Sequence, residues 1–217
     1  MKRPRRQLRP KIMRLILVRH GRPDEDDTRS PNDPPLNADG WRQARAAAHL
    51  LEGEGITRIV VSPLLRAQQT AEPLADRLGL GLETIDGWAE ADRAANRYRS
   101  TETLRAEGGG AWTRFLADPI RYLGADPASF RAGVLAALGA TVEGGHPTSR
   151  VVVFTHGLPI NIVLSHALGL DSITRFLVGY GSVTRLRRHN GGGYGVASVN
   201  ETGHQMEHFE GKSQSNG

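Results

Sequence analysis

Two kinds of hydrophobic pattern alternate along the chain: short, nearly continuous apolar runs, and longer segments with apolar residues at helical spacing. Nearly continuous apolar runs at Ile12–Val18, Thr57–Val61 and Arg150–Phe154 are typical of strands buried on both faces of a parallel sheet. The segments Asn37–Leu51 and Leu64–Leu78, which separate the first strands, carry apolar residues at helical spacing. This alternation of strands and helices predicts a βα architecture.

The remaining elements extend the same pattern. A short strand is expected at Leu82–Ile85, a helix at Leu158–Leu168, and two last strands at Val183–Leu186 and Gly195–Val199 around the turn His189–Gly193. Together these elements favour an α/β fold with a doubly wound, mainly parallel sheet and helices on both faces.

The hydrophobic pattern weakens between Glu90 and Gly145. Helical pieces are expected there at Thr101–Leu116 and Pro127–Val142, separated by breaks rich in glycine or containing proline. We therefore expect one domain over residues 12–200, with a helical, lid-like insertion around residues 90–145. Residues 1–11 are expected to form a basic extension, and residues 201–217 a polar tail.

Composition narrows the class of protein. The 217 residues include no cysteine, which excludes disulfides, thiolate zinc sites and a cysteine nucleophile. No apolar run approaches the ~20 residues that a bilayer-spanning helix needs. The expectation is a cytoplasmic protein without a membrane partner, and self-association into a homo-oligomer is compatible with the sequence.

The net charge of +5 comes almost entirely from arginine, with 25 Arg against 3 Lys. Six basic residues cluster before the first strand: Lys2, Arg3, Arg5, Arg6, Arg9 and Lys11. This cluster could contact nucleic acid or acidic lipid. However, Pro4 and Pro10 and the scarcity of apolar residues favour a disordered extension, and no aromatic residues are interleaved. Nucleic acid is not the expected partner.

Reactive residues follow three of the expected strands at the point where each strand ends. Val18 leads into Arg19, His20 and Gly21; Val61 into Ser62, Pro63 and Arg66; Phe154 into Thr155, His156 and Gly157. Because the carboxyl ends of parallel strands meet at one edge of a sheet, two arginines and two histidines are expected to converge.

Four stretches carry a resemblance to a known family: LVRHG at Leu17–Gly21, PLNADGWRQA at Pro35–Ala44, VSPLLRAQQTA at Val61–Ala71 and FTHG at Phe154–Gly157. In this order, the sequence resembles the histidine phosphatase superfamily, which includes phosphoglycerate mutases and many phosphomonoesterases. The resemblance implies an α/β sheet with helices on both faces. It also implies a phosphate pocket built from Arg19, His20, Arg66 and His156.

The chemistry of these side chains agrees with that pocket. Arginine offers a planar fork of donors to phosphate oxygens, and a neutral imidazole can attack phosphorus near neutral pH. We assign His20 as the nucleophile, with its other ring nitrogen held by a backbone carbonyl. Arg19, Arg66 and a protonated His156, together with Gly157, would bind the transferred phosphoryl group.

Each residue also has a simpler interpretation. Arg66 could pair with a surface carboxylate, and His156 could be a core or turn histidine. The two histidines could be metal ligands, but neither lies on an expected helix with a carboxylate or histidine at i+4. With two arginines and two histidines facing the phosphate, neither a metal nor a cofactor is expected.

The leaving oxygen needs a proton donor. The family places a glutamate shortly after the third strand, and the resemblance therefore implies Glu90, within DGWAEAD, as that acid. Glu90 would protonate the leaving oxygen and then activate the hydrolytic water. Asp92 is the alternative, and either residue could be a solvated loop acid.

Three functions are compatible with this fold: phosphomonoester hydrolysis, mutase-type phosphoryl transfer and phosphate binding without catalysis. Mutases of the family follow RHG with a Glu-Ser…Trp-Asn pattern, whereas this chain has Arg22-Pro23-Asp24-Glu25-Asp26-Asp27. Phosphomonoester hydrolysis is therefore favoured over phosphoglycerate mutase-type transfer. A non-catalytic phosphate-binding protein is a third possibility, although no site residue is missing.

The substrate itself is not identified by the sequence. Residues 22–34 and 90–145 are expected to form the rim and lid above the phosphate. Arg22 and Asn32 are candidate substrate contacts. Arg22, Arg93, Arg97 and Arg99 hint at a second anionic group on the substrate.

Overall fold

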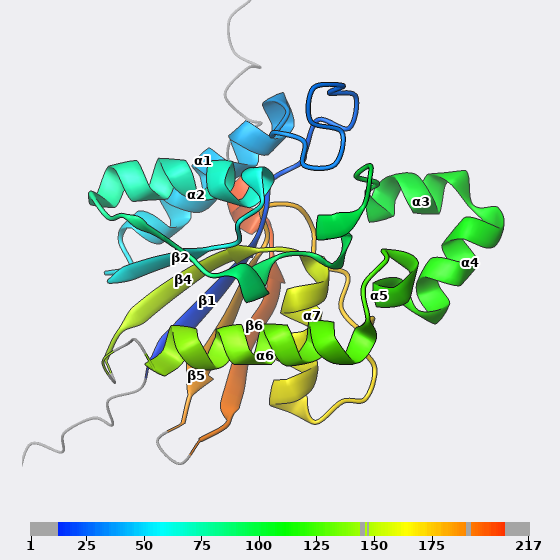
Figure 1. Ribbon diagram of the computed structural model, residues 1–217. Helices are drawn as coiled ribbons and strands as arrows, with labels where there is room; N and C mark the ends of the chain where they lie inside the picture. Colours follow the sequence, from blue (N-terminus) through cyan, green and yellow to red (C-terminus); the bar gives the residue numbers. More distant parts are fainter. Residues whose placement is uncertain (1–12, 144–145, 147, 190–191, 207–217) are drawn as a thin grey trace, which may run out of the picture.

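A computed structural model describes residues 13–143, 146, 148–189 and 192–206. The basic extension, most of the polar tail and part of the turn at His189–Gly193 lie outside these residues. A six-stranded sheet forms the centre of the fold (Figure 1). Its strands are β1 (Arg14–Arg19), β2 (Arg58–Val61), β3 (Leu82–Thr84), β4 (Arg150–Thr155), β5 (Val183–Arg188) and β6 (Tyr194–Glu201).

The strand order is β3-β2-β4-β1-β5-β6. The first four strands of this order are mutually parallel; β5 is antiparallel to both of its neighbours, β1 and β6. This arrangement confirms the predicted mainly parallel α/β sheet. It also places the carboxyl ends of β2, β4 and β1 side by side.

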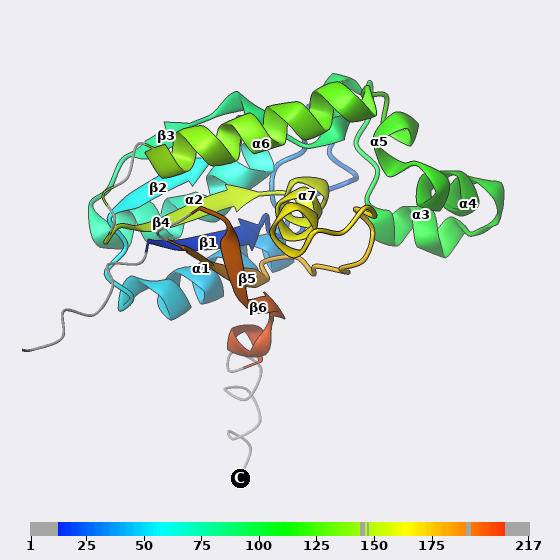
Figure 2. The same cartoon turned by 90° about the horizontal axis from the view of Figure 1, so that it is seen from below.

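Helices cover both faces of the sheet (Figure 2). The helices α1 (Ala38–Glu52) and α2 (Leu65–Leu78) pack on one face, and α6 (Pro127–Glu143) and α7 (Gly157–Leu168) on the other. Successive residues of a strand point to opposite faces, so that Ile16 belongs to the core under α1 and α2 and Leu17 to the core under α6 and α7. The result is a three-layer α/β/α domain.

The turn after β1 packs against the start of α1. As expected, Asn37 caps this helix, and its side chain accepts a hydrogen bond from the Gly40 N–H at 2.9 Å. A Cβ on Gly21 would lie 2.5 Å from the Gly40 carbonyl oxygen, and a Cβ on Gly40 would lie 2.2 Å from the Arg22 carbonyl oxygen. The two glycines are therefore required because the backbones almost touch.

The middle of the chain differs from the prediction. After the 3-10 turns η1 (Asp86–Trp88) and η2 (Ala91–Ala94), the expected helix Thr101–Leu116 is two helices, α3 (Thr101–Glu107) and α4 (Gly109–Ala117). The break falls at Gly108, whose φ of 63° and ψ of −152° are not helical. A short helix that we did not predict, α5 (Pro119–Tyr122), follows. These three helices project beyond the sheet at the carboxyl ends of β1 and β4 (Figure 2).

The end of the described chain also differs from the prediction. The strand β6 continues to Glu201, and the turn η3 (Gly203–Gln205) follows it. The Gln205 side chain donates a hydrogen bond to the Tyr180 carbonyl at 2.8 Å. Residues 201–206 are therefore part of the fold rather than of a polar tail. Among the described helices, none has the length and apolar character that a membrane crossing requires.

Candidate active site

The three strand ends meet as the sheet order requires. Arg19 is the last residue of β1, and His20 follows it; Arg66 lies in the first turn of α2, and His156 connects β4 to α7. All four side chains are buried. The His20 and His156 ring centroids are 5.0 Å apart. The predicted convergence of two arginines and two histidines is thus what the structure shows.

His20 is held in one ring orientation. Its Nδ1 lies 2.8 Å from the Gly21 carbonyl oxygen, which can only accept a hydrogen bond. The proton of neutral His20 is therefore on Nδ1, and Nε2 carries the free electron pair. Burial, together with the positive charges of Arg66 and Arg19, lowers the pKa of His20 well below its ordinary value. These features suit a nucleophile that is unprotonated at neutral pH.

The loop that carries His20 is fixed by α2. The Gly21 N–H donates to the Thr70 hydroxyl at 2.9 Å, and that hydroxyl donates to the Arg66 carbonyl at 2.6 Å. One side chain of the VSPLLRAQQTA stretch thus connects the two strand ends that supply His20 and Arg66.

Each arginine is positioned by acceptors that leave part of its guanidinium free. Arg19 Nη1 donates to the Val178 carbonyl at 2.7 Å and to Glu102 at 3.3 Å. Its guanidinium carbon lies 4.0 Å from the centre of the Tyr180 ring. Arg66 Nη2 donates to both carboxylate oxygens of Asp92, at 2.9 and 3.2 Å, and Arg66 Nη1 to Asp33 at 3.3 Å.

Three buried nitrogens in this cluster have no hydrogen-bond partner among the described residues. They are Arg19 Nε, Arg66 Nε and His156 Nδ1. A buried donor without an acceptor costs free energy, and such groups in native proteins generally meet a ligand, an ion or water. Two guanidinium donors beside a free imidazole favour an anion with several oxygens, such as a phosphoryl group.

His156 is packed beside His20, with the ring centroids 5.0 Å apart, and it is fully buried. Its Nε2 is 2.7 Å from the Ser62 hydroxyl, which also accepts the Leu64 N–H at 3.2 Å. With the Ser62 hydroxyl as the donor of this hydrogen bond, the imidazole proton is on Nδ1. Burial, followed by the charges of Arg66 and His20, lowers the pKa of His156 well below its ordinary value. Next to these charges His156 is a neutral N–H donor; the protonated form that we expected in contact with a bound anion stays a prediction.

The two candidate acids have different surroundings. Glu90 accepts hydrogen bonds from the Leu158 N–H at 3.1 Å and the Ala91 N–H at 3.0 Å, and it faces the cavity without an arginine partner among the described residues. Burial and the neighbouring charge of Asp92 raise the pKa of Glu90 to about 7. Asp92 is the counter-ion of Arg66. The arrangement suits Glu90 as the proton donor.

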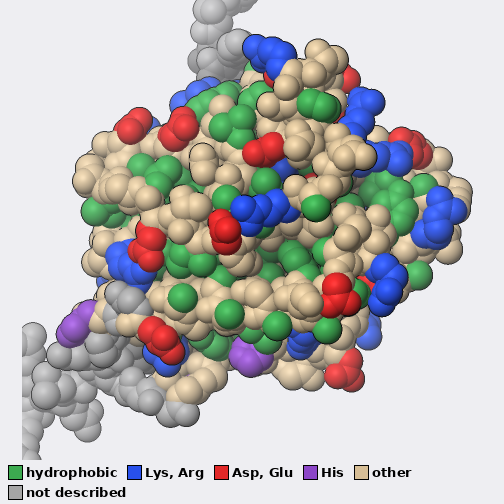
Figure 3. Space-filling model, in the orientation of Figure 1, with side chains coloured by type: hydrophobic (Ala, Val, Ile, Leu, Met, Phe, Trp, Pro, Cys, Tyr) green, Lys and Arg blue, Asp and Glu red, His purple; other side chains and the backbone are tan. Residues whose placement is uncertain are grey.

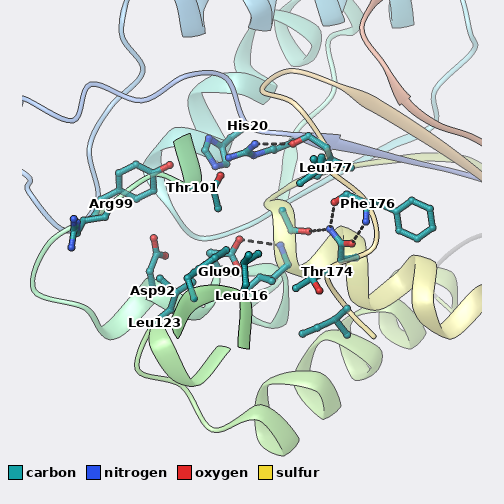
Figure 4. Close-up of a pocket in the computed structure, with 18 of the residues that line it drawn as sticks. His20, Glu90, Asp92, Arg99, Thr101, Leu116, Leu123, Thr174, Phe176 and Leu177 are labelled. Atoms are coloured by element: carbon teal, nitrogen blue, oxygen red, sulfur yellow. Dashed lines mark hydrogen bonds between the residues drawn. The ribbon is translucent and has the colours of Figure 1, made fainter. Parts of the chain in front are cut away.

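Glu90 also lies close to the arginine donor of β1. A Cβ placed on Gly157 would lie 3.9 Å from Glu90 Oε2 and 4.0 Å from Arg19 Nε. Gly157 lines the cavity, and so do Arg19, His20, Arg66 and Glu90. Figure 4 shows His20 and Glu90 on two sides of this cavity.

Two predicted substrate contacts lie elsewhere. Arg22 is exposed, with its Nη1 4.0 Å from Asp39 of α1, and it does not line the cavity. Asn32 is exposed on a turn and does not line it either. Asp33 is the residue of this loop that reaches the site, because its carboxylate accepts from both Arg66 and the Leu65 N–H.

The sequence analysis missed the apolar part of the cavity. The residues that form it come from α4, from the segment after α5, and from the loop after α7: Trp112, Phe115, Leu116, Leu123, Ile173, Phe176, Leu177 and Val178. No single stretch of sequence contains them, and each segment alone resembles ordinary core or loop. Among the described residues, no group of three or more metal-ligating side chains could hold a metal ion.

Comparison with known proteins agrees with this geometry. A family model described as the histidine phosphatase superfamily, branch 1, matches residues 15–202. A relative from Bacillus subtilis described as an uncharacterized phosphatase, PhoE, is 31% identical over 153 residues, which cover 69% of this chain and 75% of the relative.

A second relative, from Yersinia enterocolitica, is described as a probable phosphoglycerate mutase, GpmB. It is 36% identical over 99 residues, or 44% of this chain and 46% of the relative. The chain thus spans about half the length of the first curated relatives that it matches.

Among solved structures, a phosphoserine phosphatase from Entamoeba histolytica in complex with 3-phosphoglyceric acid has a similar fold. The TM-score is 0.69 at 24% identity, with 89% of this chain and 99% of that chain covered. The residues matched by the family model include the carboxyl ends of β1, β2 and β4, which carry the site. The chain belongs to branch 1 of the histidine phosphatase superfamily.

Proposed function

We propose that this protein is a phosphomonoesterase that hydrolyses a small phosphorylated metabolite through a phosphohistidine on His20, without a metal or a cofactor. The observation that carries the proposal is the set of three unpartnered buried donors beside His20: Arg19 Nε, Arg66 Nε and His156 Nδ1. These three donors equal in number the three equatorial oxygens of a phosphoryl group during transfer, and each would donate a hydrogen bond to one of them.

In the first step, His20 Nε2 attacks phosphorus and forms a P–N bond. The bond from phosphorus to the ester oxygen breaks, and its electron pair leaves with that oxygen. Glu90 gives the leaving oxygen its proton, which a group with a pKa near 7 can do at neutral pH. An alcohol departs and Glu90 becomes a carboxylate.

In the second step, Glu90 takes a proton from water while the water oxygen attacks phosphorus. The P–N bond breaks, inorganic phosphate leaves, and both His20 and Glu90 return to their starting states. The arginines and His156 hold the phosphoryl oxygens in both steps, so the site needs no reorganisation between them.

Hydrolysis is favoured over transfer between phosphoglycerates. The acidic run Asp24–Asp27 follows the RHG turn, and the outer cavity is mostly apolar, so neither offers a cationic site for a second phosphate. One relative is described as a phosphatase and another as a mutase, and the phosphatase match covers more of the chain.

The test is brief reaction with a ³²P-labelled phosphomonoester followed by quenching. We expect an acid-labile, base-stable label on His20 and release of inorganic phosphate that EDTA leaves unchanged. His20→Ala should lose both label and turnover, whereas His49→Ala, on the exposed face of α1, should retain both. Label on another residue, a metal requirement, or interconversion of 2- and 3-phosphoglycerate with little phosphate release would contradict the proposal.

A further inference from the structure

The cavity beside His20 has two chemically different ends. Its inner end contains the charged groups Arg19, Arg66 and Glu90. The apolar remainder of its lining, which we call the apolar chamber, is formed by Trp112, Phe115, Leu116, Leu123, Ile173, Phe176 and Leu177. A phosphomonoester bound with its phosphoryl group on His20 would therefore direct its alcohol part into the chamber.

Two of the polar side chains that line the cavity, Asn161 and Thr101, are already hydrogen-bonded within the protein. Asn161 Nδ2 donates to the Gly157 and Phe176 carbonyls, both at 3.0 Å, and its Oδ1 accepts the Phe176 N–H at 3.0 Å. The Thr101 hydroxyl donates to Glu102 at 2.9 Å. Few groups are left to recognise hydroxyl or carboxylate groups of a substrate.

The one additional cation that lines the cavity is Arg99. It is paired with Glu107, and in Figure 4 its side chain points away from the other labelled residues. Arg93 pairs with Asp86 on the surface, and neither Arg93 nor Arg97 lines the cavity. The second anionic group suggested by the arginine content of the sequence thus finds no unpaired cation in the chamber.

Large apolar side chains remain exposed at the mouth of the chamber. Leu116 is 48% exposed and Leu177 is 77% exposed. Figure 3 shows hydrophobic side chains at the surface over the α3–α4 region. Deeper in the chamber, Trp112 and Phe115 stack with their ring centroids 5.6 Å apart and their planes inclined by 15°. A bound apolar group would cover this surface, and burying it is favourable.

We infer that the preferred substrates are phosphomonoesters of uncharged, apolar or aromatic alcohols rather than phosphates that carry a second anionic group. The inference rests on the proposed phosphatase reaction for its orientation, with the phosphoryl group at His20. It adds the chemical class of the leaving group, which the reaction alone does not specify.

Straight-chain alkyl phosphates from ethyl to octyl test the inference, because their leaving alcohols have nearly equal intrinsic reactivity. We expect kcat/KM to rise about fourfold for each methylene that the chamber buries, until the chamber is filled. 3-Phosphoglycerate, which is small and carries a carboxylate, should be a poorer substrate than butyl phosphate.

Substitutions at the mouth of the chamber test its location. Leu116→Ser and Leu177→Ser, separately and combined, should reduce the increase per methylene to less than about twofold. Leu168→Ser is the matched control, because Leu168 is also 48% exposed but does not line the cavity. It should leave the increase unchanged, and since all three side chains are substantially exposed, folding should be retained in each variant.

Binding of non-hydrolysable alkylphosphonates of the same lengths, measured by calorimetry, separates this inference from the proposed function. If affinity rises with chain length and no ester is hydrolysed, the inference about the apolar chamber is supported and the phosphatase proposal fails. If p-nitrophenyl phosphate is hydrolysed through His20 but neither rate nor affinity depends on chain length, the chamber inference is overturned. A preference for 3-phosphoglycerate over butyl phosphate would overturn it as well.

Discussion

Arg66 donates from Nη2 to both carboxylate oxygens of Asp92, at 2.9 and 3.2 Å, and the two side chains are almost wholly excluded from solvent. This pair separates the roles of two acids that stand two positions apart in the sequence. In the proposed reaction, Asp92 balances the charge of Arg66, which binds the phosphoryl group, and Glu90 is left to exchange protons with the substrate.

The two acids should therefore respond differently to removal of their charge. Glu90→Gln cannot protonate a leaving alkoxide, so alkyl phosphates should lose on the order of 10²-fold or more in kcat, and p-nitrophenyl phosphate much less. Asp92→Asn should slow both esters alike and lower the melting temperature, because it leaves Arg66 without its buried counter-ion. An Asp92→Asn variant that discriminates between the esters would reverse the assignment.

The pH dependence of the reaction should carry the signature of Glu90. Its carboxyl group is protonated below a pKa of about 7 and donates a proton only in that form. kcat/KM for an alkyl phosphate should therefore fall as the pH rises through about 7. The His20 pKa is lowered well below its ordinary value, so the nucleophile stays unprotonated on the acid side of this transition. Glu90→Gln should abolish the decline above pH 7, and a decline that persists in this variant would assign it to another group.

We expect Glu102 to compete with phosphate for Arg19. Its carboxylate lies 3.3 Å from Arg19 Nη1 and is half exposed. Glu102→Gln should remove this competition and lower the inhibition constant of inorganic phosphate by about two- to fivefold, in keeping with a partly solvated ion pair. Glu83→Gln is the control, because Glu83 has the same exposure and pairs with Arg58 away from the site. Weaker inhibition in Glu102→Gln would mean that this carboxylate supports the phosphate site.

The contact between Gly21 and Gly40 should be sensitive to a single methyl group. Gly21→Ala places a Cβ 2.5 Å from a backbone oxygen that α1 holds rigidly. We expect a loss of about 1–3 kcal/mol in the free energy of unfolding, measured by denaturant titration. Gly53→Ala, at the end of the same helix, has no atom within 4 Å of its added Cβ and should be neutral within ~0.5 kcal/mol.

Most of the sheet, and the four arginine and histidine residues at its edge, could be predicted from the sequence. Strands such as β4 bury every residue but the first, so their apolar runs are unmistakable, and residues that follow parallel strands must meet at one edge. The positions of Arg19, His20, Arg66 and His156 follow from those two facts. The lowered pKa of His156 could not be predicted, because it results from burial and from the charges of Arg66, His20 and Arg19, which only the folded chain brings together.

The rim and lid were predicted less well. The break between α3 and α4 falls at Gly108, the first of three consecutive glycines, so the sequence carried a signal for this break that the single predicted helix ignored. Arg22 and Asn32 follow the RHG turn closely in sequence, but the loop carries both to the surface and turns Asp33 toward Arg66 instead. The apolar chamber combines three segments, so neither its existence nor its chemistry is visible in any one of them.

The apolar chamber and the residues proposed to bind phosphate also belong to different parts of the chain. The reacting groups follow sheet strands, whereas α4, the segment after α5 and the loop after α7 supply most of the apolar wall. Substitutions in those segments can accumulate without touching a group that handles phosphorus. A lineage with this architecture can acquire new substrates by revising a small, peripheral fraction of its sequence, while the bond-breaking chemistry is inherited unchanged.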